Sequence, residues 1–211
     1  MRTSAQPPRH FSMIRGFHLA DFVTLGNAAC GMAGVFLAMV YVTSGSLTDF
    51  VWAAAMAPLA FAFDFLDGRI ARWRQQHSAL GRELDSLADV ISFGVAPAVL
   101  GFTLGLRGGW DMLCLSYFVV CGVSRLARFN VTAEALADTE TGKVKYFEGT
   151  PIPTSIAIVA LLGVAFYLDR VDAALWLGSL RIAGATLHPL ALVYVLSGSA
   201  MISATLRIPK P

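Results

Sequence analysis

Charged residues are scarce in this sequence. Only 14% of its 211 residues are Asp, Glu, Lys or Arg, whereas 56% are hydrophobic. A soluble globular domain carries about 25% charged residues. The deficit excludes a single soluble core, because the apolar residues are too numerous for one and fall into long runs. We therefore expect lipid to surround most of this protein.

Cysteine is almost absent as well. The three cysteines, Cys30, Cys114 and Cys121, all lie inside apolar segments. An odd number of cysteines at such positions argues against a disulfide framework and against a thiolate metal site. We expect these side chains to pack in the lipid phase as small apolar groups.

Long apolar stretches make up most of the chain. Six of them are long enough to cross a bilayer as helices, although aspartates interrupt the second and the third. They cover approximately residues 22–42, 50–66, 84–105, 112–129, 152–168 and 185–206. Neither an internal repeat nor a low-complexity linker divides them. The sequence thus predicts an all-α polytopic membrane protein, one domain over residues 1–211 with six transmembrane helices.

Positive charge is distributed unevenly around these stretches. Of the 16 Lys and Arg residues, all but Arg107, Arg170 and Arg181 lie near the termini or around the loops that follow the second and fourth stretches. By the positive-inside rule, both termini and those two loops face the cytoplasm. Residues 1–21 are then a cytoplasmic lead-in, in which residues 12–21 suit a short interfacial helix or an irregular segment equally.

Four aspartates lie at the cytoplasmic ends of the second and third stretches. Asp64, Asp67 and Gly68 are spaced i, i+3 and i+4, which places them on one face of a helix. Asp85 and Asp89 are spaced i and i+4, so they also share a face. Two helices joined by a short turn run antiparallel, and we expect the four carboxylates to converge.

Such a cluster needs compensation for its charge. Each buried charge costs several kcal/mol, and the four carboxylates repel one another besides. Protonation of some carboxylates or a bound divalent cation are the two remedies. Because the cluster holds neither Cys nor His, we expect Mg²⁺ or Mn²⁺ rather than zinc.

Residues 64–89 match the pattern D-x-x-D-G-x-x-A-R-x8-G-x3-D-x3-D without a gap. This pattern resembles the signature of the CDP-alcohol phosphotransferases. The resemblance implies that Asp64, Asp67 and Asp85 bind two divalent cations, Mg²⁺ or Mn²⁺, that hold the diphosphate of a CDP-linked donor. It also implies that Asp89 is the general base and contacts a metal.

The same resemblance implies a nucleotide and diphosphate site beside the aspartates. The positions carried over for it are Gly68, Ala71, Arg72, Gly81, Thr24 and Asn27. Several of these positions have a second explanation in the residues alone. The glycines also suit close helix crossing, and a lone Thr or Asn also suits a hydrogen bond to a neighbouring helix. Arg72 suits phosphate oxygens or, as a cytoplasmic flank, fixes topology.

Similarity continues beyond the signature. The segments CGVSRLARFNVT (121–132) and KYFEGTPIPTS (145–155) resemble the branch of the family that uses serine as acceptor. The resemblance implies transfer of a phosphatidyl group from CDP-diacylglycerol to L-serine, which yields phosphatidylserine and CMP. It implies a homodimer among membrane lipids, without a nucleic acid partner. The short polar N-terminal segment favours a bacterial cell membrane over the endoplasmic reticulum of a eukaryote.

A zwitterionic acceptor such as serine requires a cationic side chain for its carboxylate. Arg125 and Arg128 lie i and i+3 at the cytoplasmic end of the fourth stretch, and a guanidinium matches a carboxylate in a bidentate way. Phe129 and Asn130 would complete such a pocket. The arginines also suit topology anchoring or phosphate steering. Prolines 151 and 153 break regular structure at a depth where irregular backbone is tolerated if it lines a cavity.

Two other functions fit parts of the sequence. Another alcohol, such as inositol phosphate, glycerol phosphate or choline, would use the same chemistry, with a denser basic pocket or an aromatic cage. A cation or proton transporter would also use carboxylates inside the membrane. Against a transporter, all four aspartates are expected at one side of the membrane, and no inverted repeat is visible.

Overall fold

The computed structural model describes residues 17–74, 79–137 and 146–209. The three longest helices are α1 (Leu19–Ser44), α2 (Leu47–Arg74) and α5 (Gly109–Ala137). Another long helical run consists of α3 (Ala79–Asp89), a π-helical turn η2 (Val90–Val95) and α4 (Ala96–Leu104). Two shorter helices follow 3-10 turns: η3 (Ile152–Ser155) leads into α6 (Ile156–Tyr167), and η5 (Pro189–Ala191) leads into α7 (Leu192–Ile202). A further 3-10 turn is η4 (Asp172–Ala174).

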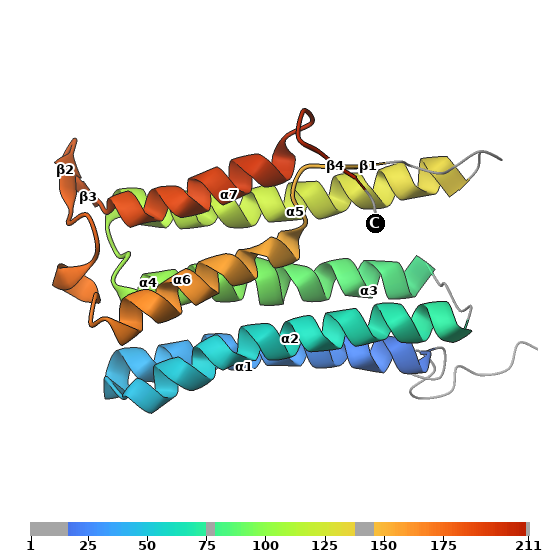
Figure 1. Ribbon diagram of the computed structural model, residues 1–211, viewed down its shortest axis with the longest axis horizontal. Helices are drawn as coiled ribbons and strands as arrows, with labels where there is room; N and C mark the ends of the chain where they lie inside the picture. Colours follow the sequence, from blue (N-terminus) through green and yellow to red (C-terminus); the bar gives the residue numbers. More distant parts are fainter. Residues whose placement is uncertain (1–16, 75–78, 138–145, 210–211) are drawn as a thin grey trace, which may run out of the picture.

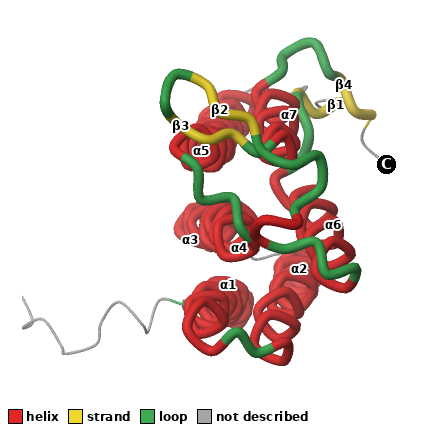
Figure 2. The backbone as a smooth tube through the Cα atoms, turned by 90° about the vertical axis from the view of Figure 1, so that its left-hand side faces the viewer, coloured by secondary structure: helices red, strands yellow, loops and turns green. Residues whose placement is uncertain are grey.

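The helices lie side by side along the long axis of the molecule (Figure 1). Figure 2 shows the helices in three tiers: α1 beside α2, the α3–α4 run beside α6, and α5 beside α7. The middle tier contacts both outer tiers. The α3–α4 run is therefore the central element, and it is the run that carries two of the four aspartates.

Two antiparallel strand pairs lie outside the bundle: one is at the end where α7 begins, and the other is beside α5, just past the end of α7 (Figure 1). The strands β1 (Tyr146–Glu148) and β4 (Arg207–Pro209) form one pair. The strands β2 (Leu180–Ile182) and β3 (Ala185–Leu187) form the other. Neither pair enters the helix bundle, so the fold is all-α in its architecture, as the sequence predicts.

Within residues 17–74, 79–137 and 146–209, four helical segments are long and apolar enough to cross a membrane. They are Leu19–Ser44, Leu47–Arg74, Leu80–Leu104 and Gly109–Val131. The segments Ile152–Tyr167 and Pro189–Ile202 are apolar but shorter. The first four expected stretches are thus confirmed as membrane-length helices, whereas the length criterion does not confirm a fifth and a sixth.

The expected bounds of the sixth stretch, residues 185–206, are wrong. Residues 185–187 form β3, and the helix α7 ends at Ile202. Pro189 opens the helical turn η5, where its fixed φ and missing N–H are tolerated. Hydropathy missed this boundary because an apolar strand and an apolar helix have the same mean hydropathy. Half of the segment in which an interfacial helix is expected (12–21), namely residues 12–16, lies outside the described residues, and α1 begins at Leu19.

Small side chains allow α1 and α2 to pack closely against each other. Ala53, Ala57 and Ala60 of α2 are buried, and a Cβ on Gly34 of α1 would lie 3.3 Å from the carbonyl oxygen of Ala53. Large apolar side chains such as Phe36 lie outside. Small residues inside and large apolar residues outside are typical of helices that associate in lipid.

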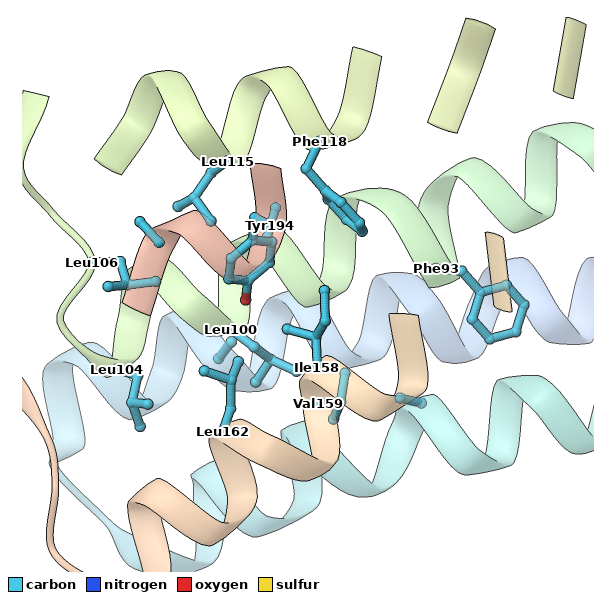
Figure 3. Close-up of a cluster of buried hydrophobic side chains, with 14 of the residues drawn as sticks. Phe93, Leu100, Leu104, Leu106, Leu115, Phe118, Ile158, Val159, Leu162 and Tyr194 are labelled. Atoms are coloured by element: carbon cyan, nitrogen blue, oxygen red, sulfur yellow. The ribbon is translucent and has the colours of Figure 1, made fainter. Parts of the chain in front are cut away.

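Larger side chains fill the space between the middle tier and the pair α5–α7 (Figure 3). The ring of Phe118 meets the ring of Tyr194 edge-on at a centroid distance of 5.3 Å. The Tyr194 hydroxyl donates a hydrogen bond of 2.7 Å to the Pro97 carbonyl oxygen, so its polar atom is satisfied in the core. The three cysteines are free, and each is buried or half-buried, in accordance with the packing role expected for them.

The end of the bundle that carries β2 and β3 is closed by a buried polar pair. Asp111, at the start of α5, is fully buried and accepts hydrogen bonds from the backbone N–H of Gly108 (2.8 Å) and of His188 (2.7 Å). The Nδ1 atom of His188 lies 2.6 Å from the same carboxylate. These bonds fasten the start of the last helical segment to α5.

Candidate active site

Three carboxylates from α2 and α3 meet in the half of the bundle away from β2 and β3 (Figure 1). One carboxylate oxygen from each of Asp64, Asp67 and Asp85 lies within 4.8 Å of the others. Asp67 is buried, and the other two are half-buried. The convergence expected of four carboxylates is thus found for three of them, and Asp89 lies outside this group.

Asp89 lies one turn beyond Asp85, at the last position of α3. Its side chain is buried, and its Oδ1 accepts a hydrogen bond of 3.2 Å from Nδ2 of Asn27 on α1. It is not one of the three aspartates whose carboxylate oxygens lie within 4.8 Å of one another. The arrangement separates a three-carboxylate cluster from a fourth carboxylate that has its own polar partner.

The polar side chains of α1 face these aspartates. The Thr24 hydroxyl donates a bond of 2.7 Å to Oδ2 of Asp67 and also lies 3.1 Å from the Ala20 carbonyl oxygen. Thr24 and Asn27 are both buried. Of the two explanations that the sequence left open for them, the structure shows the hydrogen bonds to a neighbouring helix, here to the carboxylates themselves.

The π-helical turn η2 begins directly after Asp89. Within it, Ser92 is fully buried and donates a hydrogen bond of 2.9 Å to the Asn27 carbonyl oxygen. Gly31 makes this crossing possible, because a Cβ there would lie 2.7 Å from the Cα of Ser92. Single π-helical turns often occur at functional sites. Here the turn holds α1 against α3 beside the Asn27–Asp89 bond.

A glycine opens the surface beside the three-carboxylate cluster. Among the described residues, only the Arg72 guanidinium comes within 4.0 Å of a Cβ built at Gly68, with its nearest nitrogen at 3.9 Å. Arg72 is exposed, whereas Ala71 and Gly81 are half-buried. An open backbone next to an exposed cation is suited to a large anionic ligand.

The residues expected to bind the acceptor fall into two groups. Arg125 is partly buried, and its Nε atom has no hydrogen-bond partner among the residues described. Arg128 and Phe129 are exposed. Asn130 is buried on α5, where its hydrogen bonds lead to α3.

Those bonds were not expected from the sequence. Nδ2 of Asn130 donates to Ser86 (3.0 Å) and lies 3.3 Å from each carboxylate oxygen of Glu83. Asn130 therefore links α5 to α3. Among the residues expected to bind the acceptor, Arg125 is the one that has a buried N–H donor available.

Asp21 was also missed: it is buried, accepts a bond of 2.7 Å from the His18 backbone N–H, and adds negative charge near Asp67.

The donor set of the cluster fits a hard divalent cation. Asp64, Asp67 and Asp85 offer oxygen atoms only, the ligands that Mg²⁺ and Mn²⁺ prefer. Oδ1 of Asp85 is buried and has no hydrogen-bond partner in the part of the chain that the structure describes. A buried carboxylate oxygen without a partner is costly unless a ligand or a cation meets it.

The sequence was compared with known proteins. The family model for CDP-alcohol phosphatidyltransferase matches residues 17–197. The CDP-diacylglycerol--serine O-phosphatidyltransferase of Saccharomyces cerevisiae is 43% identical over 96% of this chain and 74% of its own length. The protein of the same name from Helicobacter pylori is 39% identical over 61% of this chain, and the match spans about half (53%) of that relative. The archaetidylserine synthase of Methanothermobacter thermautotrophicus is 35% identical over 74% of this chain and 62% of its own length. On the extent of the family match, the chain belongs to the CDP-alcohol phosphatidyltransferase family.

Proposed function

We propose that this protein transfers a phosphatidyl group from CDP-diacylglycerol to the hydroxyl of L-serine and releases CMP. The observation that carries the proposal is the meeting of Asp64, Asp67 and Asp85 within 4.8 Å, one helical turn from Asp89, in a member of this family. The 43% identical relative, named for serine as acceptor, supports the choice of alcohol.

The three-carboxylate cluster would hold two divalent cations, Mg²⁺ or Mn²⁺, with Asp89 at its edge. When bound, such cations supply charge that neutralises a diphosphate and stabilises the departing CMP. The residues around the cluster would orient the donor. Gly68 leaves room for the nucleotide, with Ala71 and Gly81 along the same helix faces, and Arg72 binds phosphate oxygens.

Asp89 acts as the general base in this proposal. The serine hydroxyl oxygen attacks the phosphorus that carries diacylglycerol, a new P–O bond forms, and the P–O bond to CMP breaks. The hydroxyl proton passes to a carboxylate oxygen of Asp89. Asn27 holds Oδ1 of that carboxylate at 3.2 Å, which leaves Oδ2 for the acceptor.

Arg125 would receive the carboxylate of serine. Its Nε is buried and lacks a partner in the described structure, so it is available to a carboxylate. Exposed Arg128 and Phe129 would line the entrance. Asn130 would support this pocket indirectly, since its amide joins α5 to α3 through Ser86.

We also propose how the chain lies in its membrane. The two shorter apolar helical segments complete six crossings, and the carboxylate end of the bundle faces the cytoplasm, where serine and CMP are soluble. Arg72, Arg74 and Arg82 at that end agree with the positive-inside rule. The diacylglycerol tails would stay in the bilayer. A homodimer is the assembly that we expect. The 43% identical relative from Saccharomyces cerevisiae supports a eukaryotic membrane such as the endoplasmic reticulum rather than the bacterial cell membrane first expected.

The test is turnover of the purified full-length protein in detergent micelles with CDP-diacylglycerol and Mn²⁺. Serine-dependent release of CMP, with formation of phosphatidylserine, is the expected result. Inositol phosphate, glycerol phosphate and choline serve as competing acceptors, and Asp89→Asn is the matched inactive control. Faster turnover with one of those alcohols would refute serine as acceptor, and no CMP release with any alcohol would refute the transferase itself.

A further inference from the structure

The hairpin formed by β2 and β3 has two faces of different chemistry. Leu180 pairs with Leu187, and Ile182 pairs with Ala185. Residues directly opposite each other in an antiparallel pair share a face, and successive residues alternate between faces. One face of the hairpin therefore carries these four apolar side chains, and the other carries Arg181. The hairpin is amphipathic, and the proposed function gives its apolar face no role.

The apolar face is covered on one strand and open on the other. Helix α5 covers β3, since a Cβ on Gly109 would lie 3.1 Å from the Cβ of Ala185. On β2, by contrast, Leu180 is 53% exposed and Ile182 is 45% exposed. Leu177, just before the strand, is 79% exposed. The residues that the structure describes therefore leave the apolar side chains of β2 largely uncovered.

Aromatic side chains mark the level of the membrane surface at this end of the bundle. Trp52 lies near the start of α2, Trp110 at the start of α5 and Tyr167 at the end of α6, and all three are exposed. These helix ends lie toward β2 and β3 (Figure 1). Trp and Tyr are enriched at the membrane–water interface. The indole Nε1 of Trp110 donates a hydrogen bond of 2.9 Å to the Ile182 carbonyl oxygen, so the hairpin lies at the same level.

The apolar surface of α5 continues onto the hairpin. Leu113 follows Trp110 by three residues, so both lie on one face of α5, and Leu113 is 59% exposed. The bond from Trp110 places Ile182 next to this face. Because α5 is long and apolar enough to cross a membrane, lipid would contact this face. The uncovered side of β2 is thus an extension of a lipid-facing surface.

The backbone of the hairpin limits how deep it can lie. The two strands form a two-stranded sheet, so backbone N–H and C=O groups at its outer edges point away from the ladder. Hydrocarbon offers such groups no partner. Arg181 is also exposed, and its guanidinium requires water or phosphate oxygens. The hairpin is therefore suited to the interface and not to the hydrocarbon core.

The hairpin is held firmly on the bundle. Ala183 and Gly184 have φ values of 49° and 84°, and a type I′ turn requires a positive φ at both of its central positions. Directly after β3, His188 contacts the buried Asp111 carboxylate through both its backbone N–H and its Nδ1 atom. The fold therefore sets the orientation of the hairpin before it meets lipid.

We propose that the β2–β3 hairpin is an interfacial anchor in the leaflet opposite the carboxylate end of the bundle. Leu180 and Ile182 insert among the ends of the acyl chains nearest the head groups, and Arg181 binds lipid phosphate on the other face. The inference rests on the proposed membrane arrangement and goes beyond it. The anchor fixes the depth of α5 and of the shorter apolar segment Pro189–Ile202, which follows β3.

The test measures the lipid exposure of single side chains by electron paramagnetic resonance. Nitroxide labels are attached to Leu180→Cys, Arg181→Cys or Ile182→Cys in the full-length protein in phosphatidylcholine nanodiscs, after the three native cysteines are replaced by alanine. Leu113→Cys on α5 is the lipid-facing reference. Oxygen, which partitions into lipid, and a water-soluble nickel chelate report which phase each label meets. We expect the ratio of oxygen to nickel accessibility to be several-fold higher at positions 180 and 182 than at 181, because side chains alternate along a strand.

Hydroxyl-radical footprinting of the unmodified protein checks the same alternation without cysteines: Arg181 should be oxidised, and Leu180 and Ile182 should be protected. A nickel preference at all three hairpin positions, with an oxygen preference at 113, would overturn the anchor and leave the membrane arrangement intact. An oxygen preference at all three would also overturn it, because the hairpin would then lie in hydrocarbon. A nickel preference at 113 as well would overturn the membrane arrangement itself.

Discussion

Replacement of Asn27 by leucine tests how the fold controls the proposed base. Leucine has nearly the same size as asparagine but cannot donate to Asp89, whose Oδ1 lies 3.2 Å from Nδ2 of Asn27. The backbone carbonyl oxygen of residue 27 remains available to Ser92, so the crossing of α1 and η2 should persist. The substitution therefore removes one hydrogen bond from the carboxylate and little else.

The size of the effect follows from the bond that is lost. A hydrogen bond to a charged group contributes about 1.5–3 kcal/mol. The separation of 3.2 Å lies at the long end of the usual range, so we take the lower part of that interval. A loss of about 1.4 kcal/mol corresponds to a tenfold change in rate. We expect kcat to fall about tenfold to thirtyfold in Asn27→Leu.

The assay is CMP release at saturating CDP-diacylglycerol and serine, with both KM values measured. Thr103→Val is the matched control, because it removes a buried hydroxyl that donates within its own helix to the Leu100 carbonyl oxygen, 2.9 Å away. That variant should keep the wild-type kcat. In an Asp89→Asn background, Asn27→Leu should cause little further loss, since both changes act on one group.

One result would refute this reasoning. If Asn27→Leu left kcat unchanged and raised only the KM for CDP-diacylglycerol, the amide would act on the nucleotide, the role that the family resemblance implies for it. Additive losses in the Asn27→Leu, Asp89→Asn double variant would lead to the same conclusion.

Three further predictions concern single aspartates. Asp89→Asn should lower kcat by about 10²-fold or more while CDP-diacylglycerol still binds; wild-type turnover would remove it as the base. Asp67→Asn should raise the Mn²⁺ concentration needed for half-maximal activity, and an unchanged metal requirement would contradict its assignment as a ligand, since the amide oxygen can still accept the bond from Thr24. Asp111→Asn should lower the free energy of unfolding by about 1–3 kcal/mol in a denaturation measurement, because the buried pair with His188 is disturbed. The KM values of Asp111→Asn should not change. A changed KM would mean that this end of the bundle is coupled to the active site.

The sequence predicted the candidate site better than it predicted the ends of the helices. The period of 3.6 residues was sufficient to place Asp64 and Asp67 on one face and Asp85 and Asp89 on another. Convergence of the two faces followed from the short connection between the helices. Hydropathy located four membrane-length helices but mistook the apolar strand β3 for the start of a sixth.

Contacts that depend on how the helices cross could not be predicted from the sequence. The Ser92 bond to Asn27 requires both a π-helical turn and a glycine opposite it, and neither requirement leaves a periodic signal. The bond from Asn130 to Ser86 joins residues far apart in the chain, so their pairing is set by tertiary packing alone. Asp21 could have been recognised from sequence, since an acidic residue in the first turn of a helix often caps it.

Binding of Mn²⁺ tests the central claim most directly. Electron paramagnetic resonance of the purified protein with CDP should count two bound Mn²⁺ ions per chain, and Asp85→Asn should weaken or abolish this binding, because its Oδ1 has no other partner among the residues that the structure describes. Wild-type Mn²⁺ affinity in Asp64→Asn, Asp67→Asn and Asp85→Asn alike would contradict a cation site built from these three carboxylates.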